Sequence, residues 1–351
     1  LRHHLPQQLR PQPLQHLHQQ HQHRHRQPRH QSSPEVRERL QAVGAIAQAI
    51  SAEVQKVIIG KSHVIDNVLI NILSNGNLLF EDYPGLAKTL MTNTFADALG
   101  CDFKRVQFTP DLLPADITGT NIYDAKKGEF TFKPGPLFCN LLLADEINRA
   151  PPKTQAALLE AMQEKQVTIG TVTHKLPAPF IVMATQNPVE QEGTYPLPEA
   201  QVDRFMLKVV VDYPSKEEEI SIMKRMEGVH QPTITKVLTP EKIIELRQLV
   251  SQVFVDDKLY DYVANLVFAT RNPELFGLKD MKHLIEYGGS PRASINLIKA
   301  AKAQAFLNGR GYVTPQDIKT IGPDVLRHRI LISYEAEAQD MNSTDIIQKV
   351  F

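Results

Sequence analysis

The sequence predicts an α/β fold in which a parallel sheet flanked by helices is followed by a smaller helical domain. Strand-like runs, which we interpret as continuous rather than alternating in their apolar character, lie at 77–81, 103–108, 141–144 and 180–185, and stretches with helical periodicity separate them. Runs that are apolar throughout, rather than alternating, are typical of strands buried on both faces of a parallel sheet. After residue 213 the character of the sequence changes, and from residue 240 to the end the pattern is helical with no convincing strand, which predicts the second domain.

Composition divides the chain into four parts. Residues 1–34 are rich in His, Gln and Pro and contain few β-branched residues. We therefore expect a disordered tail, which either belongs to the natural protein or was added to it. We place the α/β domain at 35–213, a linker with a charged helix at 214–239 and the helical domain at 240–351.

The charge and the cysteine content of the chain argue against several classes of protein function. Lys and Arg together number 39, as do Asp and Glu, but five of the arginines lie in the tail. The body is therefore acidic, which argues against nucleic-acid binding. Two cysteines outside any CxxC pattern predict neither a disulfide framework nor a zinc site, and they fit a reducing cytoplasm. No apolar run is long enough for a membrane span, and we see no secretory signal.

A candidate phosphate-binding loop follows the first predicted strand and opens a helix. Lys88 would reach the β- and γ-phosphates of a nucleotide, and the hydroxyl group of Thr89 would bind Mg²⁺. Asp82 stands where the loop pattern has Gly, and its carboxylate would repel a triphosphate unless it points away. Taken alone, the stretch is also compatible with an ordinary strand–turn–helix corner.

Polar residues end two further predicted strands. Asp145 and Glu146 follow the apolar run Leu141–Ala144, where Asp145 would bind Mg²⁺ and Glu146 would orient the attacking water. Asn187 follows the next strand and would contact the γ-phosphate or that water. Two solvated acids and an Asn-Pro turn are the simpler interpretations of these residues.

The chain resembles the MoxR family of AAA+ ATPases over about residues 40–340. The stretches that carry the resemblance are Pro84–Thr89, Thr109–Gly119, Leu143–Lys153, Leu158–Glu164, Ala184–Pro188, Glu192–Phe205, Gly289–Ala293 and Pro323–Arg329. The family usually carries Ala at position 87 and Gly at position 82, so Asp82 departs from it. The resemblance implies an AAA+ P-loop NTPase core with a helical lid domain, and ATP and Mg²⁺ as cofactors.

The resemblance also implies roles for single residues. Asn187 matches the sensor-1 position, Arg292 the sensor-2 arginine of the lid and Arg204 the arginine finger, which acts on a neighbouring subunit's nucleotide. An intrachain pair of Arg204 with Asp203 or Glu199, and a surface helix cap at Arg292, are the alternatives. The nucleotide-binding positions implied are Ile58, Ile59, Pro84, Gly85, Leu86, Ala87, Lys88, Thr89 and Leu90.

Members of the family typically form rings, usually hexameric, and act with a partner that carries a von Willebrand factor A domain. The segments 117–133 and 167–179 resemble the insertions of this clade that contact protein clients, and the second one alternates about Gly170 as a hairpin would. We expect a chaperone-like or cofactor-inserting motor. A nucleotide-sensing scaffold with impaired turnover and a metal-chelatase motor subunit are the other hypotheses.

Overall fold

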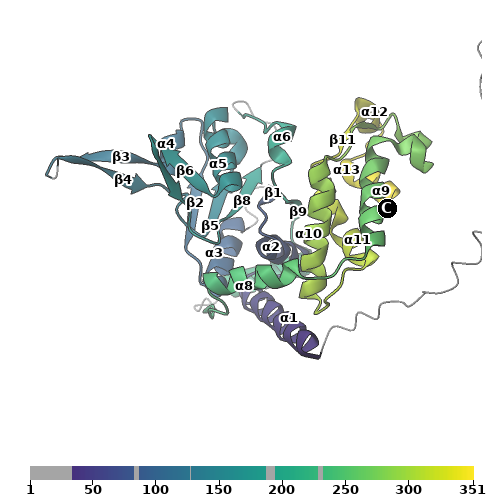
Figure 1. Cartoon of the computed structure of the whole chain (residues 1–351), viewed down its shortest axis with the longest axis horizontal. Helices are drawn as coiled ribbons and strands as arrows, with labels where there is room; N and C mark the ends of the chain where they lie inside the picture. Colours follow the sequence, from purple (N-terminus) through teal and green to yellow (C-terminus); the bar gives the residue numbers. More distant parts are fainter. Residues whose placement is uncertain (1–33, 83–86, 127, 187–193, 228–231) are drawn as a thin grey trace, which may run out of the picture.

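The computed structural model describes residues 34–82, 87–126, 128–186, 194–227 and 232–351, and the tail predicted at 1–34 lies almost entirely outside this part. Its centre is a sheet of five parallel strands in the order β2-β5-β8-β1-β9 (Figure 1). The strands are β1 (Leu78–Asp82), β2 (Phe103–Gln107), β5 (Leu141–Asp145), β8 (Ile181–Gln186) and β9 (Leu207–Val211).

Four of these strands lie where they were predicted, although β2 is an edge strand with three polar residues rather than a continuous apolar run, and β9 was missed. Strand β9 lies at an edge of the sheet and alternates in burial, with Lys208 half-buried and Val210 exposed. An edge strand therefore lacks the continuous apolar run by which the central strands were recognised. Lys208 forms an ion pair with Glu81 on the neighbouring strand β1.

Side chains of alternate strand residues pack into two separate cores. Leu78, Phe80 and Leu143 point into one core and Leu79 and Ala144 into the other. The first core includes residues of α1 (Pro34–Gln55), α2 (Ser62–Leu73), α3 (Lys88–Leu99) and the lid. The second includes residues of α4 (Pro114–Thr118), the 3-10 helix η1 (Ile147–Arg149) and α5 (Pro152–Glu164). Both faces are thus covered, as in the predicted α/β fold.

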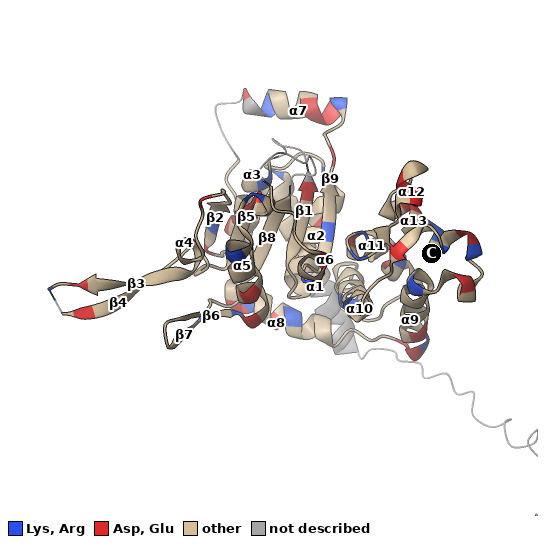
Figure 2. Cartoon of the chain, turned by 90° about the horizontal axis from the view of Figure 1, so that it is seen from above, with Lys and Arg blue, Asp and Glu red and all other residues tan. Residues whose placement is uncertain are grey.

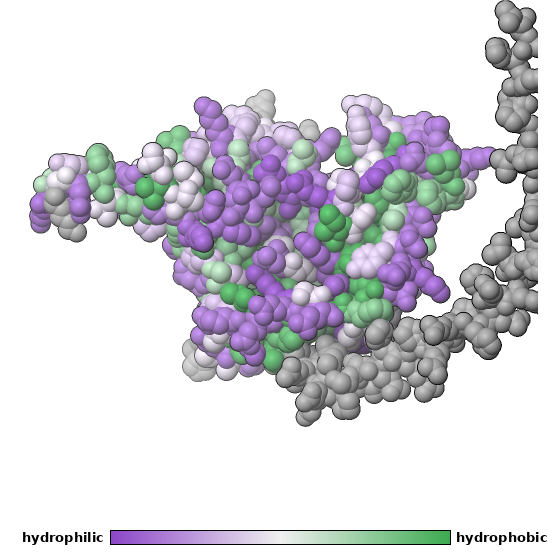
Figure 3. Space-filling model, viewed as in Figure 1, coloured by the Kyte–Doolittle hydropathy of each residue, from purple (hydrophilic) through white to green (hydrophobic). Residues whose placement is uncertain are grey.

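Two antiparallel hairpins extend from the α/β domain within the segments assigned to insertions. Strands β3 (Gly119–Asp124) and β4 (Glu129–Pro134) form a long hairpin that projects from the body (Figure 1). It exposes large apolar side chains among polar ones (Figure 3), with Ile122 47% and Phe130 71% exposed. Strands β6 (Gln166–Ile169) and β7 (Val172–Lys175) form the predicted hairpin, with Gly170 at a φ of +63° in its turn.

One residue of the second hairpin packs against the first hairpin. The imidazole ring of His174 is half-buried and stacks on the ring of Phe132, with 3.9 Å between the ring centroids. The two hairpins therefore contact one another, a tertiary arrangement that alternation within one hairpin does not reveal.

The C-terminal part is mostly helical. The helices described are α8 (Pro240–Ser251), α9 (Asp257–Arg271), α10 (Pro291–Leu307), α11 (Pro315–Leu326), α12 (Tyr334–Ala338) and α13 (Ser343–Val350), with 3-10 helices η2 (Pro273–Phe276) and η3 (Lys279–Met281). The expectation of no strand after residue 240 was wrong, because β10 (Ile285–Tyr287) pairs with β11 (Leu331–Ile332). Strands of two and three residues are too short to show a period-two pattern.

The predicted charged helix of the linker is α7 (Lys216–Met226), which stands apart from the sheet (Figure 2). The lid meets the α/β domain through a buried polar contact. Asp324 of α11 accepts hydrogen bonds from Asn67 of α2, at 3.0 Å, and from Arg327, at 2.6 Å. Among the described helices, none is long and apolar enough to cross a membrane.

Candidate active site

Residues from β1 and β5 meet at one edge of the sheet. The strands are parallel, so the end of β1 and the two acids at the end of β5 lie at the carboxyl edge. Only β8 lies between them, and Leu79, Ala184 and Ala144 are in register across the three strands. At a strand spacing of about 4.8 Å, the backbones of β1 and β5 are roughly 10 Å apart there. The long side chain of Lys88, which follows β1, and the carboxylate of Asp145 at the end of β5 can therefore reach the same ligand.

The beginning of α3 supplies the lysine and the threonine. Ala87 has a φ of +57° and precedes the helix, and Lys88 and Thr89 are its first two residues, both half-buried. No side chain of the described residues caps this helix, so its first N–H groups are suited to hold an anion. Leu90 is 42% exposed. Pro84, Gly85 and Leu86, and the side chain of Asp82, lie outside the described residues.

Asp145 is held by two residues that sequence reasoning missed. Its carboxylate accepts a hydrogen bond of 2.7 Å from the Thr185 hydroxyl group of β8. It also accepts hydrogen bonds from the Arg105 guanidinium of β2, at 2.6 Å from Nη2 and 3.2 Å from Nε. Thr185 is a polar residue after the apolar start of β8, which was a signal, whereas Arg105 lies between Lys104 and Val106 on β2 and does not stand out. The contacts fix the carboxylate at the carboxyl edge beside Thr185.

The backbone changes direction at Glu146, directly after β5. Its φ of +53° lies in the left-handed region, which is uncommon for a residue with a side chain and turns the chain at the end of β5. The backbone N–H group of Glu146 donates to the Thr185 hydroxyl oxygen at 2.7 Å, and its carboxylate pairs with Arg149 at 2.7 Å. The two acids are thus held differently, Asp145 within the sheet and Glu146 at its rim. Asn187 lies outside the described residues.

The connector between α1 and α2 provides an apolar surface at the same edge. Ile58 is buried and Ile59 is half-buried in the turn that joins the two helices. Lys61 donates from Nζ to the carbonyl oxygen of Asp212, directly after β9. This contact holds the connector at the carboxyl end of β9, next to β1.

Asp203 links the lid to the segment that carries Arg204. Its carboxylate accepts hydrogen bonds from the Ser290 hydroxyl group at 2.9 Å and from Arg329 Nε at 2.7 Å, and Arg292 Nη1 lies at 3.4 Å. Ser290, not Arg292, caps α10. Arg204 is exposed, and within the described residues the structure gives its side chain no hydrogen bond or ion pair. The pairing of Arg204 with Asp203 or Glu199 is therefore not observed there.

Arg329 was missed as a structural residue of this cluster. It follows α11 and is 4% exposed, and burial lowers the pKa of its guanidinium group to about 10. Besides Asp203, it donates to the carbonyl oxygens of Phe205, at 2.6 Å, and Met206, at 3.1 Å. It also donates to the carbonyl oxygen of Asp203 at 3.0 Å, so one lid side chain satisfies four groups around Arg204.

We expect Arg329→Met to lower the free energy of unfolding by about 3 kcal/mol or more, because it leaves a carboxylate and carbonyl oxygens without a buried partner. Urea unfolding followed by circular dichroism measures the change. Arg204→Met is the matched control, since it alters an exposed arginine of the same cluster and should change the free energy by less than about 0.5 kcal/mol. Equal effects of the two substitutions would contradict the role given to Arg329.

The fold and the placement of the site define a class of protein. A family model described as "ATPase family associated with various cellular activities (AAA)" matches residues 77–207, and one described as "AAA lid domain" matches residues 279–350. The first match spans the sheet from the start of β1 to the start of β9, and the second spans most of the lid. The chain thus has an AAA+ P-loop NTPase core with a helical lid.

Whole-chain comparisons specify the family. Chaperone MoxR1 of Mycobacterium tuberculosis is 49% identical over 298 residues, 85% of this chain and 79% of that protein. The uncharacterized protein YeaC of Bacillus subtilis is 45% identical, over 85% of this chain and 90% of its own length. A crystal structure of a protein from Cytophaga hutchinsonii has a TM-score of 0.85 and 48% identity, over 90% of this chain and 96% of that one. The chain belongs to the MoxR family of AAA+ ATPases.

Proposed function

We propose that this protein hydrolyses ATP in a magnesium-dependent reaction and uses the energy as a chaperone-like remodelling or cofactor-inserting motor. The observation that carries the proposal is the placement of Lys88 and the Asp145–Glu146 pair at one edge of the sheet, with a single strand between them. Membership of the family supports nucleotide binding in general.

The residues at the carboxyl edge divide the chemistry. Lys88 and the N–H groups at the start of α3 hold the β- and γ-phosphates. The Thr89 hydroxyl group and the Asp145 carboxylate offer hard oxygen ligands, which fit Mg²⁺. When bound, the ion neutralises the charge that develops on the transferred phosphoryl group.

The remaining residues act on the water and on the γ-phosphate. Glu146 orients and polarises the attacking water through its carboxylate, which the contacts of its backbone and of Arg149 hold at the rim of the sheet. Asn187 contacts the γ-phosphate or the water. Arg292 reaches the phosphates from the lid, and Ile58 and Ile59 pack against the adenine ring.

Assembly completes the site. The exposed guanidinium of Arg204 is available to the nucleotide of a neighbouring subunit, which supports a ring, usually hexameric in this family. The projecting β3–β4 hairpin and the β6–β7 hairpin would contact a protein client. A partner with a von Willebrand factor A domain belongs to the same proposal.

Phosphate release from ATP, measured against protein concentration, tests the proposal. Specific activity should require Mg²⁺ and rise with protein concentration, because catalysis needs two subunits. Lys88→Ala should reduce turnover to background. Turnover that is equal in the wild type and the variant would remove the basis of the assignment.

Asp82 favours one alternative, a nucleotide-sensing scaffold with impaired turnover. The residue ends β1, where the phosphate-loop pattern has Gly. Two like charges about 4 Å apart repel by about 1 kcal/mol in water and by about 4 kcal/mol at the effective dielectric constant of a protein surface. A carboxylate pointing at the triphosphate would therefore weaken ATP binding by tenfold or more.

We expect Asp82→Gly to strengthen ATP binding by less than about threefold, because an active ATPase requires this carboxylate to point away from the phosphates. Equilibrium titration with a fluorescent ATP analogue measures the dissociation constant. Asp82→Asn is the control that removes the charge without adding the backbone freedom of glycine. A gain of tenfold or more in both variants would favour the scaffold over the motor.

A further inference from the structure

A second pocket lies at the opposite edge of the sheet from the candidate active site. It has a volume of about 410 Å³ and is lined by residues of α8, of the turn before β1 and of the loop before β8. Asn75 precedes β1 and Phe180 precedes β8, so the pocket opens at the amino ends of these strands. A strand of five or six residues, at about 3.3 Å per residue, separates it from the carboxyl edge.

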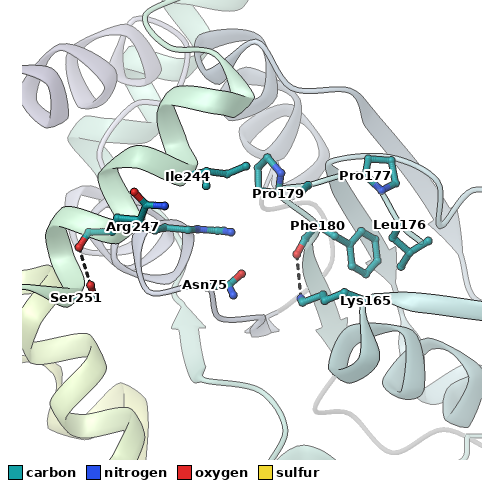
Figure 4. Close-up of a pocket in the computed structure, with 11 residues that line it drawn as sticks. Asn75, Lys165, Leu176, Pro177, Pro179, Phe180, Ile244, Arg247 and Ser251 are labelled. Carbon is teal, nitrogen blue, oxygen red and sulfur yellow. Dashed lines mark hydrogen bonds between the residues drawn. The ribbon is translucent and has the colours of Figure 1, made fainter. Parts of the chain in front are cut away.

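Two cations from different elements face this pocket. Arg247 extends into it from α8, and Lys165, between α5 and β6, approaches from the opposite wall (Figure 4). Arg247 donates from Nε to the carbonyl oxygen of Ile72 at 2.7 Å, and Lys165 donates from Nζ to the carbonyl oxygen of Phe180 at 3.0 Å. These hydrogen bonds hold the two cationic groups in place. Each uses only one N–H group, so further N–H groups on both side chains remain for other partners.

The charge of the pocket is not balanced by the described residues. None of those that line it is acidic, and Arg247 Nη2 is buried without a hydrogen-bond partner among them. A buried donor without a partner costs about 1–3 kcal/mol, and more on a charged group. Burial, and then the nearby charge of Arg247, lower the pKa of Lys165 to about 8. Burial likewise lowers the pKa of Arg247 to about 10.

The rest of the lining is apolar or neutral. Leu176, Pro177, Pro179 and Ile244 add apolar groups to the lining, and Asn75, Gln248 and Ser251 add neutral polar groups. A pocket of a few hundred Å³ with apolar walls and a few convergent polar groups is typical of sites for small molecules. A guanidinium group and an ammonium group that face the same cavity are typical of phosphate recognition.

We propose that this pocket binds a phosphate-bearing small molecule, whose phosphate group lies between Arg247 and Lys165. A phosphate with a charge of about −1.5 to −2 at neutral pH matches the two cations that face the pocket and offers acceptors to their N–H groups. The ligand joins α8 to the loop before β8, so its binding braces the helix against the α/β domain. The site is separate from the one that holds ATP.

Reactivity of the Lys165 amine tests the proposal at the site itself. The full chain is labelled with trace acetic anhydride at pH 8, with inorganic phosphate as the probe and sodium chloride at matched ionic strength as the reference. Peptide mass spectrometry reads the acetylation of Lys165 against the exposed Lys153. A phosphate that raises the pKa of Lys165 by about one unit reduces its labelling about fivefold. The same protection in Lys88→Ala would show that the phosphate loop is not its source.

Two variants connect the protection to the pocket. Arg247→Met should abolish it, with circular dichroism as the check on folding. Gln248→Glu alters an exposed residue of the pocket wall and should also abolish it, because the new carboxylate competes with phosphate for the cations. Protection that survives in a folded Arg247→Met, or that chloride provides equally well, overturns the proposal. Protection by acetate as strong as that by phosphate overturns the assignment of a phosphate ligand.

Discussion

Glu146→Gln should reduce ATP turnover by about 10²–10⁴-fold while it leaves ATP binding nearly unchanged. The amide keeps the size of the side chain and is able to accept a hydrogen bond from Arg149, which contacts the carboxylate at 2.7 Å. It lacks the charge with which the carboxylate polarises the attacking water. The phosphate-holding groups at the start of α3 are on a different element, so the affinity for ATP should remain.

Two measurements separate these effects. Single-turnover hydrolysis gives the rate of the chemical step, and titration with a fluorescent ATP analogue gives the dissociation constant. Glu160→Gln is the matched control, because Glu160 is an exposed acid of α5 away from the carboxyl edge. If the two variants turn over ATP equally fast, Glu146 does not act on the water.

Arg204→Ala should reduce turnover on the order of 10³–10⁵-fold, the range that arginine fingers contribute in related phosphoryl transfers. The guanidinium group is exposed, while the neighbouring Asp203 is held by Arg329 and Ser290. The segment is thus anchored from the lid with Arg204 facing outward. Arg204→Lys should recover little of the loss, because an ammonium group lacks the planar fork.

Mixed assemblies test whether Arg204 acts across a subunit interface. Neither Lys88→Ala nor Arg204→Ala should hydrolyse ATP alone. When the two are mixed, Lys88→Ala subunits supply an intact arginine to the nucleotide held by Arg204→Ala subunits, so part of the activity should return. An arginine that acts within its own subunit would give no recovery in the mixture.

Sequence reasoning predicted β1, β5 and β8 because these inner strands are buried on both faces, and it placed β2 correctly although that edge strand is only partly buried. It missed β9, whose edge position allows Lys208 and Val210 to face outward, and the short β10–β11 pair of the lid. Local patterns report burial along one segment. They do not report which segments pair at the edge of a sheet or across a lid.

In the candidate site, too, local patterns predicted some residues and long-range contacts placed the others. Lys88, Thr89, Asp145 and Glu146 stand next to strand and helix ends, where sequence patterns are informative. Arg105, Thr185 and Arg329 lie far along the chain from the groups they hold, as with Arg329 and Asp203, which are 126 residues apart. A single sequence gives no signal for such long-range partners, and the pocket of Arg247 and Lys165 has no motif either.

The central claim is that Lys88 and Asp145 serve one magnesium–triphosphate group. A double-mutant cycle of ATP affinity, with Lys88→Ala, Asp145→Asn and the double variant, tests it in Mg²⁺ and again in EDTA. We predict that the two losses are non-additive in Mg²⁺ and that Asp145→Asn weakens ATP binding only when Mg²⁺ is present. Strictly additive losses, together with an Asp145 effect that persists in EDTA, would contradict it.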